Sequence, residues 1–440
     1  MSRFFFDKQD ELIKRVLLEC FAQKLEEHLG KKEPPKNGSK RRSPPPLDRR
    51  AVMKDVGDAV NITLKNVKGA PEFDQKLDVR QFETFLKKIY PNYLKFPVRL
   101  DYDAAVRVKQ RMRDTVREIT VVAGTDQSKF AQAAAECFIK QLYEVGVDKP
   151  EKSKQEETKD WLNVGIVSGS TIGSTIRAAD ELDWRELLGK NVEQLPKIRV
   201  LALNVCLTTH KYLSDNANIL AHLLSNKINK TLGHGHAEAY GLSAPLLVEY
   251  SKLRETDNAP QNKDVVQWTE PNRLMPSPRP DLADDETKLD IVLTGVGELP
   301  GLDPSGEGSI FYKLSDEFGF NMKEMVNVER IVGDIAFSAI TSGGEWVPLR
   351  DKYRKTEVSE MGANSQAKNV GSKEWMFYSA VRLRILEKMA CDDKKRVILV
   401  ARKAPGKSKA PAIFASVARG HRYATHLIID EDTALELRQA

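Results

Sequence analysis

A run of hydroxyl and glycine residues lies where the sequence changes from a strand-like to a helix-like pattern. Residues 164–176 read V-G-I-V-S-G-S-T-I-G-S-T-I, and helical spacing continues through residue 182. The amides at the start of a helix have no partner within the helix, so they attract anions. Glycine lets the backbone approach a ligand, and serine and threonine add short hydroxyl donors. The pattern predicts a phosphate site formed by Ser168, Gly169, Ser170, Thr171 and Ser174.

Two nucleotide-binding motifs are absent from this loop, and their absence indicates which class of phosphate compound it suits. It has no Gly-Lys-Ser/Thr end of a nucleotide-binding P-loop, and it does not match the dinucleotide pattern Gly-x-Gly-x-x-Gly. A small phosphorylated metabolite is therefore favoured over a nucleotide. The alternative is a turn whose hydroxyls only cap a helix.

Three further segments carry groups that suit a sugar phosphate. Gly295, Gly297 and Glu298 follow an apolar run, Asp334 lies in another glycine-containing run, and Lys409 precedes an apolar helix-like segment. A sugar phosphate needs donors for its phosphate and acceptors for its hydroxyls. These segments supply both if the fold brings them together.

The sequence Gly-His-Gly-His at residues 233–236 raises the question of a metal site. Glu238 is the nearest third ligand, and histidines two positions apart splay on a helix. A polar turn is the favoured interpretation, and we expect neither a metal nor a cofactor.

The composition is that of a cytoplasmic protein outside the membrane. No apolar run approaches the roughly 20 residues needed to cross a bilayer, and residues 1–7 lack the apolar core of a signal peptide. None of the four cysteines forms a Cys-x-x-Cys pair, so we expect reduced packing residues at Cys20, Cys137, Cys206 and Cys391.

The elements that must position the candidate residues alternate between strands and helices from about residue 117. Apolar runs that can form strands lie at 118–123, 162–167, 198–206, 289–296, 396–401 and 426–429. Helical spacing occurs at 128–144, 171–182, 215–228, 374–390 and 408–419, and residues 338–347 resemble a β-hairpin. The alternation predicts an α/β fold with a mainly parallel, Rossmann-like sheet and helices on both faces. Ligands of such sheets collect at the carboxyl ends of the strands.

The excess positive charge is confined to the first quarter of the chain. Residues 1–118 contain 27 Lys and Arg against 18 Asp and Glu, whereas the remainder contains 42 against 45. This asymmetry fits a basic nucleic-acid-binding arm attached to a ligand-binding body, or else a solubilising extension.

Three helices are predicted in this basic part, at 7–29, 48–67 and 79–89, with a Pro-rich basic loop at 31–47. We therefore expect a helical region over 1–102, a connecting helix over 103–116 and a ligand-binding domain over 117–440.

The order of the segments resembles the effector domain of SorC-type sugar-binding transcriptional regulators. The matching pieces are 164–175, 243–245, 290–297, 332–335, Lys409 with 412–413, and 427–434. The resemblance implies a fold like that of glucosamine-phosphate deaminase and ribose-phosphate isomerase, used for sensing instead of catalysis. It also implies a phosphorylated-sugar effector, a DNA operator bound through an N-terminal helix-turn-helix, and a homo-oligomer, either a dimer or a tetramer.

Carried over to this chain, the resemblance implies that residues 168–171 hold phosphate and that Gly295, Gly297 and Glu298 line the pocket. Asp334 and Lys409 would face the sugar or a second phosphate, and Asp430 and Glu431 would order the final strand–helix turn. The basic loop at 402–409 departs from the family pattern, so the pocket cation is open among Arg402, Lys403, Lys407 and Lys409.

For DNA, the resemblance makes residues 48–67 the recognition helix. Arg49, Arg50 and Lys54 lie near its start, which enters the major groove in such motifs, and Arg41 and Arg42 could contact phosphates. One alternative is a sensor that has lost DNA binding. Another is a sugar-phosphate isomerase or deaminase on the same fold.

Overall fold

The structure is a computed structural model that describes the chain from residue 102 onward, with gaps. The described residues are 102–112, 115–124, 126–147, 161–204, 213–242, 246–250, 289–298, 309–355, 373–379, 381–403, 408–417 and 421–439. The helices predicted before residue 102 lie outside this part of the chain. So do the predicted DNA contacts at Arg41, Arg42, Arg49, Arg50 and Lys54.

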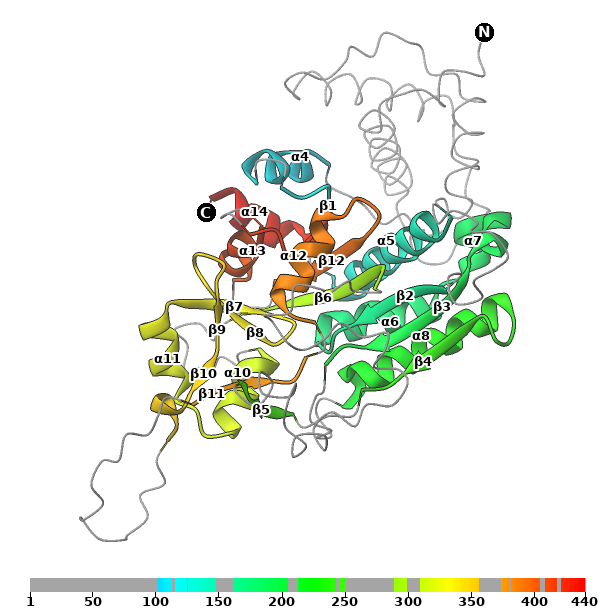
Figure 1. The fold of residues 1–440 in the computed structure, drawn as a ribbon. Coiled ribbons are helices and arrows are strands. Elements are labelled where there is room, and N and C mark those ends of the chain that lie inside the picture. The colour runs from blue at the N-terminus through cyan, green and yellow to red at the C-terminus, as the bar shows by residue number, and fades with distance from the viewer. Residues whose placement is uncertain are drawn as a thin grey trace, which may run out of the picture.

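The centre of the molecule is a mainly parallel sheet (Figure 1). Its seven parallel strands run in the order β1 (Glu118–Val122), β13 (His426–Asp430), β12 (Arg396–Ala401), β6 (Ile291–Glu298), β2 (Trp161–Ile166), β3 (Lys197–Ala202) and β4 (Ala237–Tyr240). Every residue of β13 is buried, as are all but the first of β2 and β12. Such continuous apolar strands suit a sheet that is covered on both faces. The prediction of an α/β fold with a mainly parallel sheet is confirmed.

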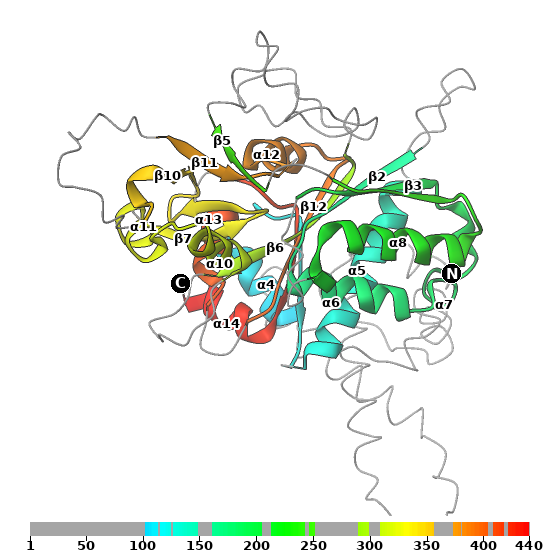
Figure 2. The ribbon, with the colours of Figure 1, turned by 90° about the horizontal axis from the view of Figure 1, so that it is seen from below.

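Helices connect most of the strands. They are α4 (Tyr102–Arg111), α5 (Gln127–Val147), α6 (Ser170–Glu181), α7 (Trp184–Leu188), α8 (Ala217–Leu232), α10 (Ile310–Glu317), α11 (Met322–Glu329), α12 (Leu383–Cys391), α13 (Ala410–Val417) and α14 (Glu431–Gln439). Short 3₁₀ turns are η2 (Gly189–Gln194), η3 (Leu213–Asp215) and η7 (Asp351–Tyr353). Figure 2 shows α5, α6 and α8 together on one side of β2 and β3, with α12 on the opposite side. Helices α4 and α14 pack against each other and against β1.

A smaller antiparallel lobe extends from β6. Strand β7 (Ile331–Ile335) pairs with β6, β8 (Ser338–Thr341) pairs with β7, and β9 (Trp346–Val347) pairs with β8. A separate small sheet joins β10 (Leu349–Arg350), β11 (Glu374–Phe377) and β5 (Leu247–Glu249). The lobe has its own apolar cluster, in which Phe377 contacts the rings of Phe311, Phe318 and Phe337. The β-hairpin predicted at 338–347 is confirmed by the pairing of β8 with β9.

The strand order reverses beside β2. From β2 the chain proceeds outward to β3 and β4, and it then returns to β6 on the other side of β2 before continuing to β12 and β13. The loops after β2 and β6 therefore leave the sheet in opposite directions. A crevice opens between such loops at the carboxyl edge, which is where open α/β sheets bind ligands.

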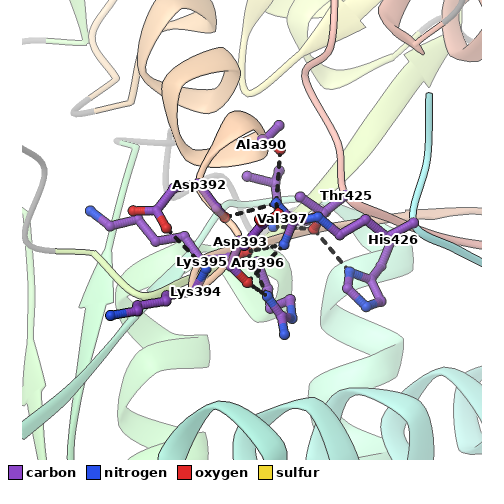
Figure 3. A network of polar contacts seen from close by, with 10 residues as sticks. Ala390, Asp392, Asp393, Lys394, Lys395, Arg396, Val397, Thr425 and His426 are labelled. Atoms are coloured by element: carbon purple, nitrogen blue, oxygen red, sulfur yellow. Dashed lines mark hydrogen bonds and ion pairs between the residues drawn. The ribbon is translucent and has the colours of Figure 1, made fainter. Parts of the chain in front are cut away.

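A polar network at the opposite, amino-terminal edge fixes the start of β1 (Figure 3). The Arg117 guanidinium donates to the carbonyl oxygens of Ala390, Asp392, Asp393 and Lys395, at distances of 2.8 to 3.2 Å. These carbonyls lie at and just beyond the C-terminus of α12, where a cation complements the helix dipole. The network therefore ties the segment between α4 and β1 to the α12–β12 turn.

The threonine before β13 extends this network to β12. The Thr425 hydroxyl oxygen accepts a hydrogen bond of 2.8 Å from the Val397 amide and lies 2.9 Å from Nδ1 of His426 (Figure 3). The Arg117 and Glu118 amides both donate to the Thr425 carbonyl. The amino-terminal ends of β1, β12 and β13 are thus joined through Thr425.

Three sequence expectations about local structure are wrong. The helix expected over 374–390 is divided, because residues 374–377 form β11 and only 383–391 form a helix. Trp375 and Phe377 pair with β5 and pack in the antiparallel lobe, and these tertiary contacts override the local helical spacing. Cys391 is exposed at the end of α12 instead of packed. The connecting helix is shorter than the expected range 103–116, since α4 ends at Arg111.

No helix among the described residues is long and apolar enough to cross a membrane.

Candidate ligand-binding site

A cavity of about 430 Å³ opens at the carboxyl edge of the sheet, between the loops after β2, β6 and β12. This position coincides with the reversal of strand order. All ten residues predicted to bind an effector line this one cavity: Ser168, Gly169, Ser170, Thr171, Ser174, Gly295, Gly297, Glu298, Asp334 and Lys409. The structure thus brings together segments that are far apart in the sequence. Their binding of a phosphorylated sugar stays a prediction.

The loop after β2 is held by its buried serine. The Ser168 amide donates to Oδ1 of Asn204 at 2.7 Å, and the Ser168 hydroxyl accepts from the Ala217 amide at 2.9 Å. One contact reaches the end of β3 and the other reaches the start of α8. Gly169 follows with a φ of 155°, which residues with a Cβ rarely adopt. Ser168 therefore positions the loop as well as lining the cavity.

Helix α6 begins directly at the cavity wall. No side chain among the described residues caps its start, so its first amides are left to a ligand or to water. The Ser174 hydroxyl donates to the Ser170 carbonyl at 2.9 Å. The hydroxyls of Ser170 and Thr171 do not cap the helix. An uncapped start, the helix dipole and adjacent hydroxyls together suit an anion.

The packing behind this helix requires another glycine. A Cβ on Gly173 would lie 2.2 Å from Oδ1 of Asp215, which accepts from Nη2 of Arg177 at 3.0 Å. The Asp215 carbonyl also accepts from the Gly169 amide. Gly173 therefore makes room for the ion pair that supports the loop.

The far wall of the cavity carries a buried carboxyl group. Asp334 is 5% exposed, and the Ser309 hydroxyl donates to its Oδ1 at 2.7 Å. The strand register sets Asp334 beside Gly297 of β6, where a Cβ would lie only 1.8 Å from Oδ1. A glycine at 297 is therefore needed for the carboxyl group to occupy this place. Burial raises the pKa of Asp334 to about 7, and the nearby Glu298 acts in the same direction.

A lysine and a second carboxylate complete this wall. Nζ of Lys409 lies 3.4 Å from Oε2 of Glu298, and both side chains are nearly buried. Lys409 and the Ser309 hydrogen bond both act to lower the pKa of Asp334, yet the effect of burial prevails. We call Glu298, Ser309, Asp334 and Lys409 the carboxylate–lysine cluster.

Four cations of the basic loop were candidates for the pocket cation, and the structure shows the ion-pair partners of two of them, Lys403 and Lys409. Lys409 pairs with Glu298 in the cavity, whereas Nζ of Lys403 lies 2.8 Å from Oε1 of Glu436 on α14. Arg402 and Lys403 also line the cavity, and Lys407 lies outside the described residues.

The two acids expected to order the final turn make such contacts. Oδ1 of Asp430 accepts from the Thr433 amide at the start of α14, and both of its oxygens accept from the Lys403 amide. Oε2 of Glu431 accepts from the Gly124 amide after β1. Neither residue lines the cavity.

The turn between β7 and β8 contributes strained backbone to the cavity wall. Ala336 and Phe337 have φ values of 49° and 63°, and both line the cavity. Residues other than glycine pay about 1–2 kcal/mol for this left-handed conformation. Strain of this kind is concentrated at functional sites, and here the Phe337 amide also donates to Asp334.

Sequence reasoning missed several lining residues. They are Gln127, Phe130, Ser309, Phe311, Lys313 and Phe337, among others. Ser309 carried a signal, because a serine before the apolar run at 310–314 is an N-cap pattern. Its hydroxyl accepts from the Tyr312 amide, as a cap does. The aromatic residues carried no signal, since spacing alone does not separate lining from core residues.

The described residues contain no group of three or more His, Cys, Asp or Glu that could hold a metal ion. The Gly-His-Gly-His stretch forms the turn between α8 and β4. Glu238 instead lies near Arg199, with Nε and Oε2 3.7 Å apart.

Comparison with known proteins adds structural likenesses only. No protein-family model matches the sequence, and no curated protein matches it. The full-length sorbitol operon regulator SorC from Klebsiella pneumoniae matches with a TM-score of 0.47 and 13% identity, over 98% of this chain and 100% of that chain. A domain of a possible sugar-binding transcriptional regulator from Arthrobacter aurescens matches with a TM-score of 0.42 and 16% identity, over 77% and 97%.

A 6-phosphogluconolactonase from Plasmodium vivax matches more distantly, with a TM-score of 0.31 and 10% identity over 76% of this chain and 98% of that chain. The solved structures that this chain is similar to thus include proteins named as SorC-type and sugar-binding transcriptional regulators.

Proposed function

We propose that this protein is a DNA-binding transcriptional regulator that senses a phosphorylated sugar in the cavity described above. The observation that carries the proposal is the convergence of an uncapped helix start and the carboxylate–lysine cluster on one cavity at the reversal of strand order. The first supplies donors for a phosphate. The second supplies acceptors for sugar hydroxyls and one further donor.

The cavity volume supports a ligand of this size. About 430 Å³ lies at the lower end of the range for small-molecule sites. The walls combine polar groups with Phe130, Phe311 and Phe337, whose rings can cover the apolar face of a sugar. The loop after β2 lacks the glycine motifs by which nucleotides are usually bound.

The regulatory part of the proposal rests on the charge of the first 102 residues and on the order of the sequence segments. An excess of Lys and Arg in that part favours binding to the DNA operator. A ligand can alter DNA affinity only if it binds two states of the protein differently. Strands β12 and β13 run from the cavity loops to the network that holds the α4–β1 segment, so they offer a physical route. A homo-oligomer in the cytoplasm belongs to the same proposal.

One observation favours a second function, that of a sugar-phosphate isomerase or deaminase. A carboxyl group whose pKa is raised to about 7 by burial is suited to general acid–base catalysis near neutral pH. Asp334 has this property and lines the cavity. The basic N-terminal region has no evident use in such an enzyme, so sensing remains the first proposal.

Thermal unfolding in the presence of sugar phosphates, their free sugars and inorganic phosphate tests the binding step. A ligand at about 100 times its Kd stabilises the protein by roughly 2.7 kcal/mol. We expect a shift with a phosphosugar and none with its free sugar. Ser170→Ala combined with Thr171→Ala should weaken this binding without loss of folding. Thr231→Ala is the control, because its hydroxyl donates to the Lys227 carbonyl within α8 and does not line the cavity.

The same samples separate a sensor from an enzyme. Interconversion of aldose and ketose phosphates, or release of ammonia from an amino sugar phosphate, would refute the regulator in favour of the enzyme. No thermal shift with any phosphosugar would refute both.

DNA binding is tested by its dependence on salt. Replacing Arg49, Arg50 and Lys54 with alanine should reduce the slope of log K against log salt by roughly 0.9 for each DNA phosphate that these side chains neutralise. An unchanged slope would exclude this segment from the DNA interface.

A further inference from the structure

The carboxylate–lysine cluster has more negative than positive groups. Glu298 and Asp334 provide two carboxyl groups, and Lys409 provides one ammonium, which already lies 3.4 Å from Glu298. The Ser309 hydroxyl and the Phe337 amide donate to Asp334, and neither carries charge. When both carboxyl groups are ionised, the cluster therefore has a net charge of −1.

Water screens these charges very little. Asp334 is 5% exposed and Lys409 is 6% exposed. Burial raises the pKa of Asp334 to about 7, and the neighbouring Glu298 adds to this rise. Another negative group beside the cluster would be opposed by the loss of water and by repulsion from these carboxylates.

The opposite wall suits an anion. It contains the uncapped start of α6 with Ser170 and Thr171. Lys313, Arg402 and Lys403 also line the cavity and add positive charge to it. The two walls therefore suit different ends of a ligand. The start of α6 suits an anionic end, and the carboxylate–lysine cluster suits an end that bears hydroxyl donors.

We propose that the cavity selects a sugar monophosphate with no second acidic group, because the sugar hydroxyls donate to Glu298 and Asp334 where a carboxylate or a second phosphate would meet like charge. This inference rests on the proposed function of the cavity and adds the class of ligand. The sequence left open whether Asp334 and Lys409 face the sugar or a second phosphate, and this inference places the sugar beside them. Lys409 remains able to donate to a hydroxyl or carbonyl oxygen while it pairs with Glu298.

Matched ligands that differ by one acidic group test this selection. Titration calorimetry on the full chain would compare fructose 6-phosphate with fructose 1,6-bisphosphate, and glucose 6-phosphate with 6-phosphogluconate. Ribose 5-phosphate and 5-phosphoribonate provide a third pair with a shorter skeleton. In any pair whose monophosphate binds, we expect the second acidic group to weaken binding about tenfold or more.

Two variants assign the selection to the cluster. Glu298→Gln removes the charge and keeps the shape, so it should reduce the ratio of affinities in the binding pair by about tenfold. Glu329→Gln is the matched control, because it also removes the carboxylate partner of a lysine, Lys352, and neither residue lines the cavity. It should leave the ratio unchanged.

A measurement on the unaltered protein covers the case in which Glu298→Gln does not fold. The ratio for glucose 6-phosphate and 6-phosphogluconate should be smaller at pH 6 than at pH 8, because protonation of Asp334 removes one of the two negative charges. The groups that face Asp334 are Ser309, Glu298, Lys409 and the Phe337 amide. The sugar-acid carboxylate stays ionised at both values, so it does not contribute to the change.

The outcomes distinguish this inference from the proposed function. Equal affinity for a monophosphate and its bisphosphate or acid would overturn the inference and leave a phosphosugar sensor. A ratio that is unchanged in folded Glu298→Gln would overturn the role of the cluster. No binding by any sugar phosphate would refute the proposed function and the inference with it.

Discussion

Replacing Asp334 with asparagine should stabilise the protein near neutral pH and have little effect in acid. The substitution keeps the size of the side chain, and the amide oxygen can still accept from the Ser309 hydroxyl, now 2.7 Å from Oδ1 of Asp334. It removes a charge that is buried beside Glu298. The variant therefore isolates the cost of ionising this carboxyl group inside the protein.

The pKa of Asp334 sets the magnitude and the sign. Burial raises this pKa from 3.8 to about 7 in the folded protein. Between these values the folded state keeps the proton and the unfolded state releases it, so the stability of the unaltered protein falls as pH rises. At about 1.36 kcal/mol per unit of pKa, the cost reaches roughly 4 kcal/mol above pH 7 and vanishes below about pH 4.

Urea unfolding of both proteins at several pH values between about 4 and 8 measures this cost. The difference in the free energy of unfolding, variant minus unaltered protein, should grow with pH and become constant above about 7. The difference cancels the titration of groups common to both proteins. A difference that stays constant over this range would refute the reasoning, because Asp334 would then ionise alike in the folded and unfolded states.

Three other substitutions test the packing around the site and the network below it. Gly297→Ala should lower the free energy of unfolding by about 3 kcal/mol, because its Cβ would lie 1.8 Å from a carboxyl oxygen, whereas Gly295→Ala meets nothing closer than 3.6 Å and should change it by less than about 1 kcal/mol. Equal effects in urea unfolding would show that the close approach is not needed. Arg117→Ala removes four hydrogen bonds to carbonyls and should cost about 2 kcal/mol, with Arg117→Lys recovering only part in the same assay. Thr425→Val keeps its shape but leaves the buried Val397 amide without its side-chain acceptor, so a decrease of about 1–3 kcal/mol is expected and no decrease would show that another acceptor replaces it.

The glycine- and hydroxyl-rich loop after β2 and most of the parallel sheet were predictable from local pattern. The apolar run at 164–167 leads directly into Ser168, and the helix predicted at 171–182 is observed at Ser170–Glu181. A strand, a glycine-containing turn and a helix start are specified by residues close in the chain. The carboxyl-end rule for parallel sheets then indicates on which edge the loop lies.

The division of residues 374–390 was not predictable in this way. The segment has apolar residues at spacings compatible with one helix, but Trp375 and Phe377 find partners in β5 and the antiparallel lobe. Strand formation at this place depends on residues more than 100 positions earlier in the sequence. Local spacing contains no information about such pairing.

The sequence by itself determined the residue types of the site and the order in which strands, loops and helices present them. Only the tertiary structure decided their partners: Lys409 with Glu298, Lys403 with Glu436, and Asp334 beside Gly297 and Ser309. The physical reason is that helix starts and turns arise from neighbouring residues, whereas burial and ion pairing depend on the register of strands that meet across the sheet. The tertiary structure also decided the raised pKa of Asp334, because this rise comes first from burial, which exists only in the folded protein.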